Sequence, residues 1–125
     1  MSLRTPLGKV LGRGSAGEGV GHWWVQRVTA VALLPLTASF VISLLGHSLQ
    51  SYEDMHGWLS RPWVAVFTIL LVLTLAWHSK LGVQVVIEDY VHGKGAKTIL
   101  LVTSTFVHLG AAVAATFAIL VIALS

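Results

Sequence analysis

The feature that most constrains this chain is a set of three long stretches without any charged side chain, at residues 28–52, 62–79 and 98–125. A helix that crosses a bilayer needs about 20 predominantly apolar residues. The second stretch is the shortest, but its apolar helical pattern continues past Lys80 to about Tyr90. We therefore predict an all-α integral membrane protein with three transmembrane helices, over about residues 22–48, 62–90 and 97–124.

Composition indicates the same class of protein. Hydrophobic residues make up 55% of the 125 residues and charged residues only 10%, whereas about a quarter of the residues of a soluble domain are charged. Three helices and their short loops use almost the whole chain, so we predict a single membrane-anchor domain over residues 1–125. The chain has no cysteine, which excludes disulfides, Cys-ligated iron–sulfur clusters and covalently attached haem for this chain.

The distribution of basic residues predicts the orientation. Four of them precede or open the first helix: Arg4, Lys9, Arg13 and Arg27. The loop before residue 62 is net acidic, whereas the loop after residue 90 holds two lysines. The positive-inside rule then places the N-terminus in the cytoplasm and the C-terminus in the periplasm. Residues 1–21, rich in Gly and Ser, are predicted to form a cytoplasmic arm. Because the basic residues form no single patch, we expect no nucleic-acid binding.

His78 is an ionisable residue deep in the second apolar helix, and such residues usually serve a function. At 100° per residue, Gly82, Val85 and Asp89 fall within about 40° of His78 around the helix axis. One stripe thus carries an imidazole, a position without a side chain and a carboxylate. A glycine one turn from a histidine lets a flat macrocycle approach the backbone. The residues alone leave two interpretations open: a neutral histidine bonded to a neighbouring helix, or a haem ligand.

Tyr90 lies about 18 Å along the helix from His78, at 1.5 Å per residue. The two residues therefore suggest two separate sites. Tyr90 is either an interfacial aromatic residue or a donor to a quinone carbonyl, with Asp89 relaying protons. Arg27, at the start of the first helix, either reaches lipid phosphates or pairs with a carboxylate such as a haem propionate.

His108 is a second histidine at a similar depth, in the third helix, so a haem held by both histidines of this chain is conceivable. A run of small residues follows it: Gly110, Ala111, Ala112, Ala114, Ala115 and Ala118. Small residues at four-residue spacing are typical of tight helix packing, which favours a hydrogen bond from His108 within a helix interface. Lys80 lies about 200° from His78 and is predicted either to reach the membrane surface or to meet an acidic group of a partner. His22, His47, His56 and His92 lie at helix ends or in loops and carry little signal.

The segment from His78 to Tyr90 resembles the signature of the succinate dehydrogenase hydrophobic membrane anchor, the smaller of two anchor chains and the one associated with cytochrome b556. That family has a histidine in helix two, a glycine four residues later, and Asp-Tyr at eleven and twelve; His78, Gly82, Asp89 and Tyr90 match. The opening of the first helix, residues 22–30, is similar to the family's entry with Arg-x-Thr-Ala. The Val-Ile-Glu-Asp-Tyr variant looks like the alphaproteobacterial and mitochondrial branch.

The resemblance implies the following roles. His78 would be one axial ligand of haem b, and the second anchor chain, cytochrome b556, would supply the other histidine within a heteromeric helix bundle. Tyr90 would bind ubiquinone beside Asp89, and Arg27 would lie near the haem propionates. The anchors would hold an iron–sulfur subunit and a flavoprotein subunit of succinate:quinone oxidoreductase, respiratory complex II.

On this interpretation the chain is not an enzyme by itself. Because no Arg/Ser-rich presequence is seen, we expect a bacterial inner membrane rather than a mitochondrial one. Two alternatives stay open: a self-contained dihistidine cytochrome b of another respiratory complex, using His78 and His108, and a structural or transport protein without a redox group.

Overall fold

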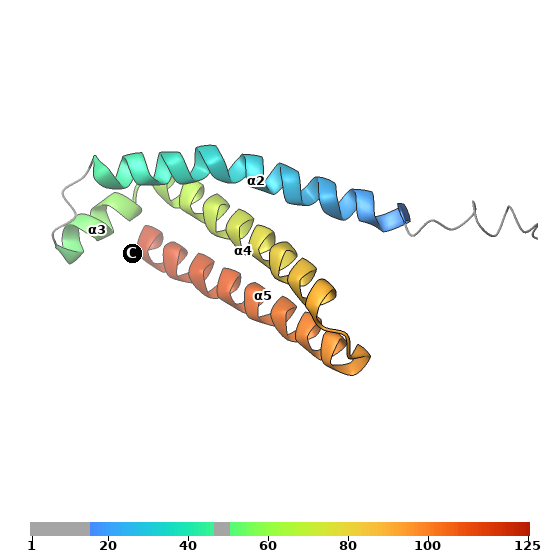
Figure 1. Cartoon of the computed structure of the whole chain (residues 1–125). Helices are drawn as coiled ribbons and strands as arrows, with labels where there is room; N and C mark the ends of the chain where they lie inside the picture. Colours follow the sequence, from blue (N-terminus) through green and yellow to red (C-terminus); the bar gives the residue numbers. More distant parts are fainter. Residues whose placement is uncertain (1–15, 47–50) are drawn as a thin grey trace, which may run out of the picture.

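The computed structural model describes residues 16–46 and 51–125. Within these residues the chain forms four helices and no strand: α2 (Ala16–Leu45), α3 (Tyr52–Leu59), α4 (Pro62–Tyr90) and α5 (Lys94–Leu124) (Figure 1). Three of them are long and apolar enough to cross a membrane, over Val20–Leu45, Pro62–Tyr90 and Lys94–Leu124. The prediction of an all-α membrane protein with three spanning helices is thus confirmed.

The three long helices form a layer with α4 in the middle. Both α2 and α5 pack along α4. Figure 1 shows α2 and α5 on two sides of α4. Only seven hydrophobic residues of the described part are buried, and most large apolar side chains are exposed on the helices. The layer therefore leaves apolar surface that lipid or other chains would cover.

One end of the layer, which we call the closed end, is packed by α3. Ser51 starts this short helix with a capping box: its hydroxyl accepts from the backbone N–H of Asp54, whose carboxylate accepts from the N–H of Ser51. Trp58 is buried there and donates a 2.9 Å hydrogen bond from Nε1 to Ser43 Oγ on α2. Its ring also meets Phe40 edge-on at 5.6 Å between centroids. The buried cluster around Trp58 is the main core of the chain.

The other end, which we call the open end, holds the start of α2, the end of α4 and the start of α5. Residues 91–93 connect α4 to α5. Lys97 Nζ donates a 2.8 Å hydrogen bond to the carbonyl of Glu88 in the last turn of α4. A cation at this position offsets the negative end of the helix dipole. It therefore reduces the electrostatic cost of placing two carboxylates in the last turn of α4. No element comparable to α3 packs this end among the described residues.

The boundaries differ from the predicted ones in three places. The first helix begins at Ala16 and ends at Leu45, so residues 16–21 are helical where a flexible arm was predicted; residues 1–15 of that arm lie outside the described residues. The third helix begins at Lys94, three residues early. The short helix α3 was not predicted, although the Ser51–Asp54 spacing is a recognisable capping signal. The second helix begins and ends at the predicted residues.

Candidate functional site

His78 lies on the side of α4 that faces α2. Its Nδ1 is 2.9 Å from Thr29 Oγ1, and this hydrogen bond joins the two helices. The imidazole is half-buried. Within the described residues Nε2 has no hydrogen-bond partner. It is also not enclosed, unlike the buried polar atoms of the chain that lack a partner. The second ring nitrogen therefore reaches the surface of this chain with its bonding capacity unused.

A groove of about 600 Å³ between α2 and α4 lies on the open-end side of His78. It is lined by His22, Trp23, Gln26, Gly82, Gln84, Val85 and Glu88. Gly82 and Val85, two members of the predicted stripe below His78, thus border a real hollow. A Cβ at Gly82 would meet only Gln26 Nε2, at 3.9 Å, which is an ordinary contact. Packing inside this chain therefore does not require the glycine.

Two polar atoms in this groove are enclosed and have no partner within the described residues: His22 Nε2 and Gln26 Oε1. Such atoms are costly in an apolar environment when they stay unpaired, so this groove has unused hydrogen-bonding groups. The sequence prediction gave His22 little weight and did not include Gln26. The spacing of His22, Gln26 and Thr29, which places all three on one face of a helix, is the signal that could have found them.

Asp89 and Tyr90 end α4 at the open end, and both are exposed; Tyr90 is 78% exposed. Neither forms a hydrogen bond within the described residues. The structure does not bring them together with His78, as their distance along the helix predicts.

Arg27 lies on a different side of α2 from the groove. Its guanidinium carbon is 5.5 Å from the centre of the Trp23 ring, and the side chain is exposed. Arg27 is about 160° from Thr29 around the helix, and Thr29 faces α4. The structure therefore places Arg27 away from His78 and not beside it.

His108 lies between α5 and α4, and both of its ring nitrogens are used. Nδ1 donates a 2.7 Å hydrogen bond to the carbonyl of Ser104, one turn earlier on α5. Because Nδ1 carries the proton, Nε2 accepts from Ser79 Oγ on α4, at 3.2 Å. The predicted bond within a helix interface is present, and the contact with Ser79 places His108 at the depth of His78.

The small residues after His108 are only partly covered within the described residues. Ala112 is buried, but Gly110, Ala111, Ala114 and Ala118 are exposed, and a Cβ added at Gly110 would meet nothing within 4 Å. Within the described residues the run is therefore only partly covered, where α5 packs against α4 and α3.

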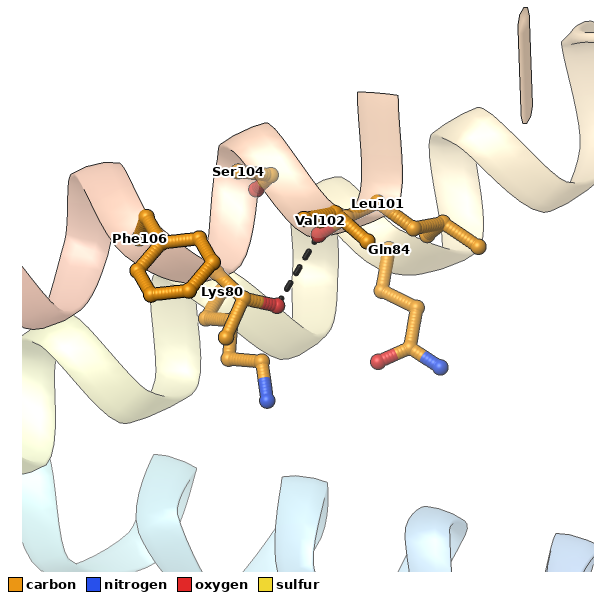
Figure 2. A pocket seen from close by; sticks show the side chains of 7 residues that line it. Lys80, Gln84, Leu101, Val102, Ser104 and Phe106 are labelled. Atoms are coloured by element: carbon orange, nitrogen blue, oxygen red, sulfur yellow. Dashed lines mark hydrogen bonds between the residues drawn. The ribbon is translucent and has the colours of Figure 1, made fainter. Parts of the chain in front are cut away.

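Lys80 faces α5, on the other side of α4 from His78. It borders a cavity of about 330 Å³ whose other walls are Gln84, Leu101, Val102, Ser104, Thr105 and Phe106. Figure 2 shows the side chains of Lys80 and Gln84 at this cavity, and its dashed line marks the hydrogen bond from Thr105 Oγ1 to the Leu101 carbonyl. Lys80 Nζ lies 5.0 Å from the centre of the Trp77 ring. Within the described residues the ammonium meets this aromatic ring and no carboxylate.

Metal binding by this chain alone has no support in the described residues. No group of three or more His, Cys, Asp or Glu side chains converges there.

The chain is similar over most of its length to proteins of one family. The family described as succinate dehydrogenase/fumarate reductase transmembrane subunit matches residues 1–123. The chain is 34% identical to the succinate dehydrogenase hydrophobic membrane anchor subunit of Paracoccus denitrificans, over 85% of this chain and 82% of the relative. It is 33% identical to the protein of the same name from Rickettsia bellii, over 71% of each chain. It is 31% identical to the succinate dehydrogenase membrane anchor subunit of Reclinomonas americana, over 66% of this chain and 71% of the relative. No solved structure matches the chain significantly.

These relatives are membrane anchors of a multisubunit complex, which agrees with three spanning helices and with a role that is not catalytic by itself. The chain is thus a multi-pass protein of the bacterial inner membrane that associates with other subunits. The resemblance predicted from His78, Gly82, Asp89 and Tyr90 is confirmed. The chain belongs to the succinate dehydrogenase/fumarate reductase transmembrane subunit family, within which its relatives are membrane anchor subunits.

Proposed function

We propose that this chain is the membrane anchor of a succinate:quinone oxidoreductase that supplies one axial histidine to a shared haem b and one wall of a ubiquinone site. The observation that carries the proposal is His78: its Nδ1 is held by Thr29, while its Nε2 has no partner in the described residues. Haem b, when bound, takes up and releases single electrons. The chain's own contribution is to fix the ligand and shape the surface beside it.

The residues around His78 fit a haem. The groove below it has apolar walls from Trp23 and Val85 and no side chain at Gly82. His22 Nε2 and Gln26 Oε1, which have no partner in the described residues, lie in this groove. Gln26 lies beside Gly82, and His22 lies nearer the open end, where the polar edge of a macrocycle would meet the membrane surface. Arg27 would join the propionates only if these extend around α2 to its outer side.

A second histidine from the other anchor chain would complete the iron ligation. His108 is poorly suited to this role, because Ser104 and Ser79 occupy both of its nitrogens. A self-contained dihistidine cytochrome b would require His108 to give up the bond to Ser79 and leave the interface between α4 and α5. The shared arrangement needs no such change in this chain.

Tyr90 and Asp89 would form this chain's part of the ubiquinone site. Their exposure at the end of α4, without partners in the described residues, leaves the phenol free to donate to a quinone carbonyl and the carboxylate free to pass on a proton. The positive-inside rule puts this end at the cytoplasmic face. There the iron–sulfur subunit would deliver electrons that the flavoprotein subunit takes from succinate.

Purification of the whole complex in mild detergent tests the proposal. We expect the flavoprotein, the iron–sulfur subunit and a second anchor to copurify with this chain, and a reduced-minus-oxidised spectrum of a b-type haem. A preparation without haem and without a flavoprotein would overturn the proposal. Haem that stays with this chain after the second anchor is removed would overturn the shared ligation.

A further inference from the structure

Thr29 has a hydroxyl whose contacts determine the state of the His78 ring. Its Oγ1 lies 2.8 Å from the carbonyl oxygen of Val25, 3.1 Å from that of Gln26 and 2.9 Å from His78 Nδ1. A hydroxyl has one proton to donate and lone pairs that accept. Carbonyl oxygens only accept, so the hydroxyl satisfies the ring nitrogen and a carbonyl together when it donates to the carbonyl and accepts from Nδ1–H.

The opposite proton placement is less favourable. If Nε2 carried the proton, its N–H would point out of this chain without an acceptor among the described residues, and an unpaired donor is costly in an apolar environment. With the proton on Nδ1, the outward-facing Nε2 has a lone pair. A lone pair on an outward nitrogen is what a metal requires of a neutral imidazole.

We infer that Thr29 is a positioning residue for iron ligation by His78: it holds the imidazole in the Nδ1-protonated form and fixes the direction of Nε2. The inference rests on the proposed haem ligation and adds a residue to it. Histidines that bind metals commonly donate their other N–H to a partner that fixes the ring, and loss of such partners lowers metal affinity about 10- to 100-fold. Here the partner comes from α2, so the ligand on α4 is oriented by the neighbouring helix.

The test compares Thr29→Val, which has a similar shape without the hydroxyl, with Thr29→Ser, which retains it, in the purified complex. Thr105→Val is the matched control, because Thr105 is also half-buried and donates to the carbonyl four residues earlier, but does so on α5. The haem content per flavin, the haem affinity on reconstitution and the haem midpoint potential are measured. For Thr29→Val we expect about a tenfold loss of affinity and a rise in potential, because an imidazole without an acceptor at Nδ1–H donates less to ferric iron.

Thr29→Ser is expected to keep most of the native affinity and potential, and Thr105→Val to leave both unchanged. Native values in Thr29→Val, in a complex that loses haem when His78 is replaced by leucine, would overturn the inference and leave the proposed ligation intact. A native complex without haem, or one whose haem ignores His78→Leu, would instead overturn the proposed ligation. If Thr29→Val does not assemble, Thr29→Ala is measured; failure of both to assemble would make Thr29 a packing residue and overturn the inference.

Discussion

Two histidines, one on α4 and one on α5, lie at the same depth on opposite sides of α4 and are bonded in different ways. On the α2 side, His78 uses one ring nitrogen and leaves the other without a partner in the described residues. On the α5 side, His108 uses both, one within α5 and one across to Ser79. Both are half-buried, so burial does not distinguish them. The number of ring nitrogens already engaged separates a candidate ligand from a packing residue.

The largest expected effect comes from removing each histidine in turn. His78→Leu should remove the haem absorbance of the purified complex, because His78 is the imidazole that the proposal makes this chain's axial ligand. His108→Leu should retain it at close to the native haem-to-flavin ratio. The measurement is a reduced-minus-oxidised spectrum normalised to flavin. If His108→Leu lost more haem than His78→Leu, the assignment of the two faces would be reversed.

The comparison can be extended to the two exposed tyrosines at opposite ends of the layer. Tyr90, at the open end, and Tyr52, at the closed end, are 78% and 77% exposed, so Tyr52→Phe is a matched control. Tyr90→Phe should slow ubiquinone reduction about a hundredfold, since it removes the proposed donor to the quinone carbonyl. Succinate oxidation by an artificial dye should be unchanged in both variants. Equal quinone reductase rates in the two variants would remove Tyr90 from the site.

Two glycines, Gly82 on α4 and Gly110 on α5, lie in different surroundings. Gly82 borders the groove below His78, whereas Gly110 on α5 has open space around it. A leucine at Gly82 should fill the groove and lower haem affinity about tenfold, since overpacking of about 1–3 kcal/mol corresponds to one or two factors of ten. Gly110→Leu should leave haem affinity unchanged. Reconstitution with haem at increasing concentration measures both, and equal affinities would show that the groove does not receive the macrocycle.

Much of this arrangement can be predicted from the sequence. The features that cannot be predicted depend on packing between helices. Long uncharged stretches predict spanning helices because the bilayer demands length and apolarity. The stripe of His78, Gly82 and Val85 follows from helical periodicity alone. The same periodicity places Gln26 and Thr29 with His22 on one face of α2, but it does not show which face of α2 meets α4. That choice is made by packing between helices and is not encoded in either helix taken alone.

The run of small residues on α5 has the pattern of a packing surface, yet only part of it meets another helix of this chain. A single sequence shows that a face is suited to close packing without showing which chain provides the neighbour. Lys80 is a comparable case: its ammonium meets the Trp77 ring, and nothing in the described residues explains a cation at that depth.

The smallest expected effect comes from removing the hydrogen bond between Ser79 and His108. Ser79→Ala removes the hydroxyl that donates to His108 Nε2 across the two helices. Hydrogen bonds between membrane helices average about 0.6 kcal/mol, so the thermal midpoint of the complex should fall by no more than about 2 °C. The haem spectrum and midpoint potential should stay at their native values, because His108 does not reach the iron in the proposed site.

Ser104→Ala serves as the control for this variant. The stronger bond of His108 Nδ1 goes to the Ser104 backbone carbonyl, at 2.7 Å, and the substitution leaves that carbonyl in place. The two variants therefore differ in whether they break the contact between α4 and α5. A haem shift in Ser79→Ala but not in Ser104→Ala would mean that the freed Nε2 of His108 approaches the iron. In that case the two faces of α4 would share one redox site, and the separation of ligand and packing histidines would no longer hold.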